Sequence, residues 1–413
     1  MMKIAPMSRP LAFAAIADDF TGGSDLASMI ASQGVATALV FGLRDAGLLA
    51  SLNAQAIVAC FKSRSVPAPE ARAIARAAHA MLATLHPRQF FFKYCSTFDS
   101  TPAGNIGPVL EELLALTQAP YTIAVPALPV NGRTQCLGHL FVNGVLLQES
   151  SLARHPINPM TDSNLPRWLA RQTRLPIGLI ELPIVRRGPA AIRQVLEQNT
   201  NAVIHFIDAI EDTDLDAIAA ATHDLPLLSG GSGIGAALAK HWPQAIGNTV
   251  SSNKPLGPRT LILSGSCSDA TLAQLRHLSD NGVPIHRLTR TTCDEVALQA
   301  DLQHNNLAVL ASSSAQTTPD AASYFEHYFG KLAQRAVQLW GVERLIVAGG
   351  ETSGAVVSAL DIPAAKITSI ISPGVPALLT HGSKKLGLAL KSGNFGSLEF
   401  FTEAQAHLDK IRL

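Results

Sequence analysis

The chain has 413 residues, of which 47% are hydrophobic and only 15% are charged, and its formal net charge is +1. This length allows two or three domains with substantial cores. The balanced charge excludes the basic surface typical of nucleic-acid-binding proteins, so we expect no nucleic-acid partner. No apolar run reaches the length of a membrane span, so we also expect no membrane partner.

The cysteines are scattered and form no Cys-x-x-Cys pair. This pattern argues against a disulfide framework and against a zinc site, and it indicates a cytoplasmic protein with reduced thiols. The apolar run 11–17 follows Lys3 and Arg9 and superficially matches a signal peptide. Because the run is short and stops at Asp18 and Asp19, we interpret it as a buried first strand.

Apolar runs of strand length alternate with helical patterns along the chain. The predicted strands are residues 11–17, 36–41, 56–60, 89–93, 121–125, 203–207, 225–229, 260–264, 307–310, 344–348 and 367–371. The predicted helices are residues 22–33, 68–84, 105–117, 189–198, 213–222, 233–241, 268–280, 293–303, 319–340 and 352–360. Such alternation favours an α/β protein with mostly parallel sheets and helices on both faces, here two three-layer αβα domains.

Apolar periodicity fades after Pro243, where Gly, Ser, Asn and Pro accumulate. We therefore predict a first domain at 1–243, a linker at 244–259 and a second domain at 260–413. A second aperiodic stretch, residues 126–168, is predicted to be irregular. Long irregular segments in compact domains are often functional, and the polar residues of this one fit either a surface loop or a substrate lid.

Asp18 and Asp19 come directly after the first predicted strand and precede a Thr-Gly-Gly turn and a helix. Open α/β sheets bind ligands beyond the carboxyl ends of their strands. Paired carboxylates at that edge can hold a substrate hydroxyl, act as a general base or bind Mg²⁺ through water. Helix capping would account for one aspartate but not for the pair with its glycine turn.

Further polar residues follow the next predicted strands. Arg64 offers a planar fork that matches a carboxylate. Lys93, Asp99 and Ser100 place a cation, an acid and a hydroxyl at another strand end. This mixture suits a hydroxylated, negatively charged small molecule, although a solvated loop or turn is the alternative for each segment alone.

The segment 229–236 contains Gly231, Gly233 and Ala236 in the G-x-G-x-x-A spacing of a dinucleotide fingerprint. That fingerprint also needs an acidic residue about twenty positions further on, after a second strand. The chain has Ser251 to Asn253 there instead. An anion-binding turn is therefore the favoured reading, and NAD binding is weakly supported.

The C-terminal part contains two turns between a strand and a helix that are built from small residues. The first holds Ser264, Gly265 and Ser266, and the second holds Gly349, Gly350, Glu351, Thr352 and Ser353. Free N–H groups at helix N-termini accept phosphates, so we predict a nucleotide site. Neither turn is a Walker A motif. Tight turns in a glycine-rich fold are the alternative.

Five segments together resemble the four-carbon acid sugar kinase family, most closely its 3-oxo-tetronate 4-kinase branch. They are Ala17–Gly22, Ser63–Ser65, Cys95–Ser100, Gly349–Gly354 and Lys391–Gly396. The likeness extends over essentially the whole chain in the same order. It implies an acid-sugar domain followed by an ATP domain, and transfer of a phosphoryl group to the 4-hydroxyl of a four-carbon sugar acid with ATP and Mg²⁺.

By motif matching, the resemblance implies specific roles. Asp18 or Asp19 would act as the base, and Arg64, Lys93, Asp99 and Ser100 would bind the sugar acid. The nucleotide would contact Ser264, Gly265, Ser266, the 349–353 turn and Gly393. No metal ligand is assigned, and a homodimer is one option for the oligomeric state.

One departure from the family pattern bears on the substrate. Relatives that act on threonate-type acids have a Lys-x-Asp-Ser core, whereas this chain has Thr97 before Phe98-Asp99-Ser100. This favours the 3-oxo branch over a threonate or erythronate kinase, and it leaves the lysine role to Lys93 or vacant. An NAD-dependent sugar-acid oxidoreductase and a non-catalytic acid-sugar sensor are the alternatives from other classes.

Overall fold

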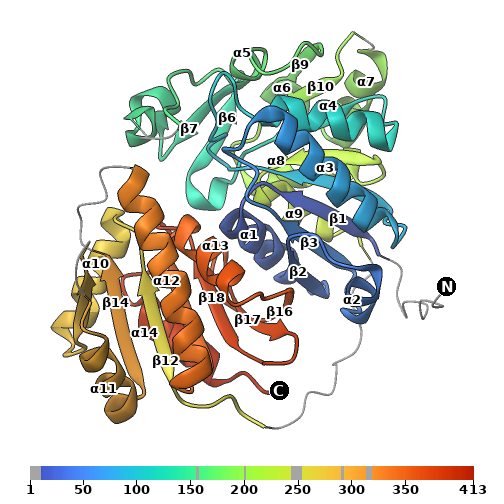
Figure 1. Cartoon of the computed structure of the whole chain (residues 1–413). Helices are drawn as coiled ribbons and strands as arrows, with labels where there is room; N and C mark the ends of the chain where they lie inside the picture. The colour runs from blue at the N-terminus through green and yellow to red at the C-terminus, as the bar shows by residue number, and fades with distance from the viewer. Residues whose placement is uncertain (1–10, 155–157, 200, 243–253, 290–292, 313–318) are drawn as a thin grey trace. The chain divides into compact units, whose positions relative to one another are not determined.

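The computed structural model describes residues 11–154, 158–199, 201–242, 254–289, 293–312 and 319–413 (Figure 1). The chain divides into two compact units. The first unit comprises residues 1–37 and 42–245, and the second comprises residues 38–41 and 246–413. Each unit is built on a mostly parallel sheet with helices packed against it, which confirms the predicted α/β class.

The sheet of the first unit has the strand order β3-β1-β4-β11-β5-β10-β9, and its neighbouring strands pair in parallel. Its strands are β1 (Phe13–Ala17), β3 (Ala56–Cys60), β4 (Gln89–Lys93), β5 (Thr122–Val125), β9 (Ile177–Ile180), β10 (Ile204–Ile207) and β11 (Leu227–Gly230). Every residue of β1 and β3 is buried. Strands buried on both faces read as continuous apolar runs, which is why the sequence revealed them.

Helices of the first unit pack in two groups. In one group, α1 packs on α9, α9 on α8 and α8 on α7; in the other, α3 packs on α4. The bounds are α1 (Phe20–Ala31), α3 (Ala68–Ala83), α4 (Ile106–Thr117), α7 (Pro189–Gln198), α8 (Asp212–Thr222) and α9 (Ser232–Ala239). Shorter helices are α2 (Ala46–Ser51), α5 (Leu165–Leu169) and α6 (Leu182–Val185).

The prediction that residues 126–168 are irregular is wrong in part. They contain a small antiparallel sheet of β6 (Arg133–Cys136), β7 (His139–Val142) and β8 (Val145–Leu146), followed by 3-10 turns. The buried carboxylate of Asp208 accepts hydrogen bonds from the N–H groups of Leu137 at 2.7 Å and Gly138 at 3.0 Å, which fixes the β6–β7 turn. Strands this short leave too little alternation to detect. Residues 155–157 lie outside the described residues.

The second unit has the strand order β13-β14-β12-β15-β18-β17-β16, and β16 also pairs antiparallel with residues 38–40 of β2 (Thr37–Phe41). Its strands are β12 (Thr260–Ser264), β13 (Ile285–Leu288), β14 (Leu307–Ser312), β15 (Arg344–Ala348), β16 (Ala364–Ser372), β17 (Val375–His381) and β18 (Gly387–Lys391). Only the pairs made by β16 and β17 are antiparallel among its described strands.

The helices of the second unit are α10 (Asp269–Asp280), α11 (Glu295–Asn305), α12 (Pro319–Leu339), α13 (Gly350–Ala359) and α14 (Phe400–Asp409). Leu275 of α10 and Phe400 of α14 join a core with Ile262, Ile346 and Ala389 on one face of the sheet. Successive strand residues point to opposite faces, so their sequence neighbours face the other layer. The α12 and α13 helices pack on each other.

Part of the predicted linker, residues 244–253, lies outside the described residues. The rest belongs to the second unit: Leu256 is buried in its core, and the Lys254 carbonyl accepts a hydrogen bond from Leu413 N. Among the helices that the structure describes, none combines the length and apolarity needed to cross a membrane.

Candidate active site

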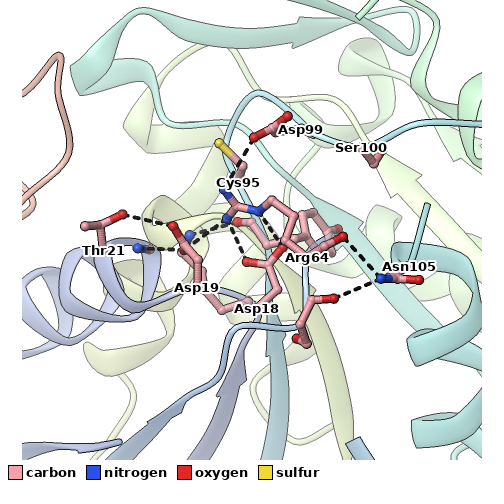
Figure 2. Close-up of polar contacts among 12 residues, drawn as sticks. Asp18, Asp19, Thr21, Arg64, Cys95, Asp99, Ser100 and Asn105 are labelled. Atoms are coloured by element: carbon pink, nitrogen blue, oxygen red, sulfur yellow. Dashed lines mark hydrogen bonds and ion pairs between the residues drawn. The ribbon is translucent and has the colours of Figure 1, made fainter. Parts of the chain in front are cut away.

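Neighbouring strand ends bring the predicted acid-sugar residues together. Parallel pairing places Ala17, the last residue of β1, opposite Cys60 of β3 and Lys93 of β4. The segments that follow these strands therefore leave the same edge of the sheet, where open α/β sheets bind ligands. Asp18, Arg64 and Asp99 meet there (Figure 2).

Arg64 is the centre of this cluster. Its Nε donates to Asp18 Oδ2 at 2.9 Å and its Nη2 donates to Asp18 Oδ1 at 2.7 Å, a bidentate pair. Nη2 also lies 3.0 Å from Asp19 Oδ1, and Nη1 lies 3.4 Å from Asp99 Oδ2. One guanidinium therefore faces the carboxylates of Asp18, Asp19 and Asp99 (Figure 2). This geometry exploits the rigid donor fork of arginine, which lysine lacks.

The two adjacent aspartates have pKa values that shift in opposite directions. Burial raises the pKa of Asp18, and the nearby Arg64 only partly offsets this effect. Burial also opposes ionisation of Asp19, but Arg64, Lys93, the Thr21 hydroxyl and the Gly22 N–H outweigh it and lower the pKa of Asp19. Carboxyl pairs separated in this way commonly divide acid–base roles between them.

Asp19 also caps helix α1. Its carboxylate accepts hydrogen bonds from Gly22 N at 2.8 Å and from Thr21 Oγ1 at 2.9 Å. A Cβ on Gly22 would lie 2.2 Å from Asp19 Oδ1, so only glycine fits this turn. Capping thus accounts for Asp19, as expected for one member of the pair, and leaves Asp18 without a structural role of that kind.

Lys93 is buried beneath this cluster. Its side chain is 1% exposed, and Nζ donates to the Tyr94 carbonyl at 2.8 Å. Its charge lowers the pKa of Asp19 and, less strongly, that of Asp18. Lys93 therefore supplies positive charge to the edge of the sheet from inside the unit.

Ser100 lies beside the Arg64 cluster, where it lines a small concavity together with Asp18, Arg64 and Asp99, and a hydrogen-bond network fixes its side chain. Its Oγ donates to the Phe98 carbonyl at 2.9 Å and accepts from Trp168 Nε1 at 3.1 Å and Gln172 Nε2 at 3.0 Å. A hydroxyl has one donor and two acceptor lone pairs, so these contacts use its full capacity. In this conformation Ser100 anchors the loop after β4 to Trp168 and Gln172, which sequence reasoning missed.

Asn105 is another residue that sequence reasoning missed, although it lies beside the Asp99–Ser100 segment. Its Nδ2 donates to the carbonyls of Ser63 at 2.9 Å, Arg64 at 3.2 Å and Val66 at 2.7 Å (Figure 2). Asn105 thereby shapes the loop that carries Arg64. A polar residue just before a helix was the available signal, but nothing in the sequence identifies its partners.

Replacing Asn105 by alanine should release the Arg64 loop. The change removes a buried donor and leaves three backbone carbonyls unpaired, so we expect a loss of about 1–3 kcal/mol in unfolding free energy. Urea unfolding followed by circular dichroism measures it. Asn164→Ala is the control, because it removes a single cap bond, the one that Arg167 N donates to Asn164 Oδ1. Equal losses for both variants would contradict the role given to Asn105.

A small concavity opens at this edge of the sheet. Its lining combines apolar walls from α4 and β4 with six polar residues, Asp18, Ser63, Arg64, Asp99, Ser100 and Asn105. Asp19 does not line it. Such a mixture of walls is typical of small-ligand sites, but the empty volume of about 230 Å³, open solvent included, is below the roughly 300–1,000 Å³ of most ligand pockets, so the concavity forms only part of a substrate site.

The segment 229–236 does not form a dinucleotide loop in the structure. A Cβ on Gly230 would lie 2.3 Å from the Val125 carbonyl oxygen, and one on Gly231 would lie 2.6 Å from that of Pro126. Close packing of the β11–α9 turn against the chain after β5 thus explains both glycines. No acidic partner for a ribose is needed to account for them.

In the second unit, the predicted nucleotide residues also share one sheet edge. Parallel pairing places Ala348 of β15 opposite Ser264 of β12 and Lys391 of β18. The predicted nucleotide residues lie at the end of β12, in the turns that follow these strands and in the first turn of α13: Ser264, Gly265, Ser266, Gly349, Gly350, Glu351, Thr352, Ser353 and Gly393. The structure therefore brings three separated segments of sequence to one place.

Small residues are required where these turns meet. A Cβ on Gly265 would lie 1.9 Å from Thr352 Oγ1, and a Cβ on Gly393 would lie 2.5 Å from Ser266 Oγ. Gly349 has a φ of 117°, which side chains rarely tolerate, and it precedes the first residue of α13. The turns thus approach one another through bare backbone, which suits close contact with a phosphate chain.

Two buried hydroxyls at this edge have no hydrogen-bond partner. They are Ser264 Oγ at the end of β12 and Ser353 Oγ in the first turn of α13, both fully buried. Together with the N–H groups at the start of α13, they fit a polyphosphate. Among the described residues, no group of three His, Cys, Asp or Glu side chains could hold a metal ion, so ligands for Mg²⁺ stay unassigned.

Comparison with known proteins agrees with this two-part arrangement. Residues 13–238 match a family described as a sugar-binding N-terminal domain, and residues 261–401 match a nucleotide-binding C-terminal domain. The 3-oxo-tetronate kinase of Burkholderia multivorans is 42% identical over 98% of this chain and 99% of its own. The chain belongs to the four-carbon acid sugar kinase family. The resemblance inferred from the motifs is confirmed.

Other members of this family cover the chain just as fully. The 3-oxo-tetronate kinase of Pseudomonas fluorescens is 40% identical over 97% of both chains. A crystal structure from Salmonella typhimurium matches with a TM-score of 0.82 and 37% identity, covering 96% of this chain and 99% of that one. A Haemophilus influenzae structure matches with a TM-score of 0.75 and 36% identity, covering 96% and 100% of the two chains. These matches show that the chain shares its fold with both solved structures, the first of which is described as a “putative tRNA synthase”.

Proposed function

We propose that the protein is an ATP-dependent kinase that phosphorylates the 4-hydroxyl of 3-oxo-tetronate, a four-carbon sugar acid. The similarity to 3-oxo-tetronate kinases over nearly the full length carries this proposal. The Arg64 cluster supports it with groups suited to a hydroxylated anion, and the glycine turns of the second unit support it with a polyphosphate cradle. Residues 1–243 would bind the sugar acid and residues 260–413 the nucleotide.

We assign the proton-accepting role to Asp18. It lines the concavity, and burial raises its pKa, whereas Asp19 is committed to the α1 cap and stays ionised. Asp18 would hold the terminal hydroxyl and take its proton as the phosphoryl group is transferred. Phosphoryl transfer depends mainly on alignment and charge neutralisation, so one positioned base suffices on the acceptor side.

Charge and hydrogen bonding assign the remaining roles. Arg64, supported by Lys93, would neutralise the substrate carboxylate, and Asp99 would accept a hydrogen bond from a substrate hydroxyl. Ser100 would contribute through the loop it anchors. The nucleotide would be held by Ser264, Ser353 and the backbone of the three turns, with Mg²⁺ neutralising charge on its phosphates.

The direct test is ADP release with a panel of four-carbon sugar acids, with and without Mg²⁺, followed by NMR of the product. Phosphorylation of 3-oxo-tetronate at the 4-position, dependent on Mg²⁺, is the expected result. Preference for threonate or erythronate would move the protein to another branch of the family. NADH formation without ADP release would favour the oxidoreductase alternative, and ligand binding without either product would favour the sensor.

A further inference from the structure

Lys391 is a fully buried lysine next to the glycine turn that contains Gly393. It is the last residue of β18, and none of its surface is exposed. Fully buried lysines are rare unless they are paired, yet burial is what shifts the pKa of this one, and no carboxylate pairs with it among the described residues. Its position in the nucleotide-binding unit suggests a role beyond packing.

The ammonium group of Lys391 faces a cage of oxygen atoms. Nζ lies 2.9 Å from Thr271 Oγ1 and 2.9 Å from the Gly393 carbonyl oxygen. The carbonyl oxygens of Ser392 and Phe395 follow at 3.2 Å and 3.1 Å. The ring of Phe400 closes the site, with its centroid 5.5 Å from Nζ. The chain of residues 392–395 thus wraps around one positive charge.

This cage determines which way the loop's N–H groups point. In a trans peptide, the N–H lies opposite the carbonyl of the same unit. The Ser392 and Gly393 carbonyls turn toward Lys391, so the N–H groups of Gly393 and Asn394 are directed away from it. Successive outward N–H groups form an anion-binding concavity.

Other contacts tie this loop to the rest of the nucleotide edge. Ser268 Oγ and Thr271 Oγ1, at the start of α10, donate to the Gly393 carbonyl at 2.6 Å and 2.7 Å. The main-chain carbonyl of Lys391 accepts from Gly349 N at 2.9 Å. Lys391 therefore contacts both glycine turns, one through its side chain and the other through its backbone.

We propose that Lys391 is a positioning residue for the nucleotide: its ammonium holds the carbonyls of Ser392, Gly393 and Phe395 inward so that the N–H groups of Gly393 and Asn394 face the phosphates. The assignment rests on the proposed kinase function. It identifies a residue that would raise nucleotide affinity without touching the nucleotide.

The proposal leads to an unusual pH dependence. Burial lowers the pKa of Lys391 to about 7. The groups that face it are Thr271 and Ser268 from α10, Phe400 from α14 and the backbone of Ala348 from β15, none of which is ionisable in this range. As the pH rises through about 7, the amine keeps two donors for four acceptors, so nucleotide affinity should fall.

The free energy of unfolding should instead increase as the pH rises. An unfolded lysine keeps its proton up to its ordinary value of 10.5, so the unfolded state binds more protons than the folded state between about pH 7 and that value. Lys391 therefore makes the fold more stable as the pH rises over this range. A lysine that only fills space would show this stability trend without any change in nucleotide affinity.

The test is calorimetric titration of ADP into the full chain at about pH 6 and about pH 8.5, for the wild type, Lys391→Met and Lys384→Met. Lys384 is a matched control because its Nζ also donates to a backbone carbonyl of the same unit, that of Val337. We expect Lys391→Met to bind ADP at least ~10-fold more weakly at the lower pH, equivalent to about 1.4 kcal/mol. The difference should shrink at the higher pH, and Lys384→Met should match the wild type throughout. In steady-state assays, the KM for ATP should rise and that for the sugar acid should not.

Unchanged ADP affinity in a folded Lys391→Met protein would overturn the positioning role alone. Absence of ADP binding by the wild type would overturn both this role and the proposed function. If Lys391→Met fails to fold, Thr271→Val removes one oxygen of the cage with little change in shape. That variant should also weaken ADP binding, and wild-type affinity in it would overturn the proposal.

Discussion

Replacing Asp18 by asparagine is expected to lower kcat for the sugar acid by about 10²–10⁴-fold, the usual contribution of a general base. Asparagine keeps the shape of the side chain but cannot accept the proton of the attacking hydroxyl. Steady-state assays with saturating ATP measure the effect. Thermal unfolding of the same protein separates lost chemistry from lost stability, because Arg64 also loses one charged partner.

Asp19→Asn provides the matched control for this prediction. Asparagine is as good an N-cap as aspartate, and its single oxygen can still accept from Gly22 N, although it gives up the second acceptor that the Thr21 hydroxyl uses. We expect a loss in kcat of less than ~10-fold, since this side chain keeps its structural role. The reverse order, with Asp19→Asn the more damaged, would transfer the role of the base to Asp19.

The pH dependence of wild-type activity should report the ionisation of Asp18. The proton acceptor must be ionised, so activity should fall on the acid side as the pH drops through the pKa of Asp18. Burial raises that pKa above the ordinary value of 3.8. The residual activity of Asp18→Asn should lack this acid limb, whereas that of Asp19→Asn should retain it.

Replacing Arg64 by alanine is expected to damage both stability and substrate binding. The change leaves the carboxylates of Asp18, Asp19 and Asp99 facing one another without their shared cation. Breaking a buried ion pair costs about 3–5 kcal/mol, and we expect the lower end because water reaches Asp19 and Asp99 in part. The KM for the sugar acid should rise at least ~10-fold, equivalent to about 1.4 kcal/mol.

Calorimetric unfolding across the acid range tests whether the stability lost in Arg64→Ala is electrostatic in origin. Asp19 has a lowered pKa in the fold, so its ion pair stabilises the protein above pH 3.8 and the stabilisation is lost as the pH falls through the folded value. The gap in Tm between wild type and Arg64→Ala should therefore narrow in acid. Arg76→Ala is the control, because Arg76 is largely exposed and its pair with Glu112 should contribute little. Equal losses in both variants, or an unchanged KM, would remove Arg64 from the site.

The sequence correctly predicted those helices and strands whose own residues show both the periodic pattern of the element and a break at each end. The strands at 260–264 and 344–348 and the helix at 189–198 have the predicted bounds, because long apolar or amphipathic runs end at clear breaks. The strands 285–288 and 375–381 were missed. The first has only four residues, two of which are the polar His286 and Arg287, and the second contains Pro376 and pairs antiparallel at the side of a parallel sheet.

The candidate site also contains some residues that could be predicted from the sequence and others that could not. Asp18, Arg64 and Asp99 could be grouped from sequence because each follows a strand, and parallel pairing brings such ends together. The roles of Asn105 and Lys391 could not be predicted in this way. Their partners are backbone carbonyls, whose directions depend on the finished fold rather than on residue type. The kinase family was identified from five motifs that occur in the family's order along the chain. The spacing of residues within any one motif was not sufficient for this.

The short strand 38–41 has a consequence for how the protein can be divided. Those four residues belong to the second unit and the first three of them pair with β16, while the chain on both sides of them belongs to the first. The polypeptide thus passes from one unit to the other at 37–38 and at 41–42, as well as at 245–246. Cutting at the last point alone would deprive the C-terminal fragment of an edge strand and expose the unpaired backbone of β16, which invites aggregation. Expression of the halves as separate, soluble pieces would first require grafting residues 38–41 onto the C-terminal fragment.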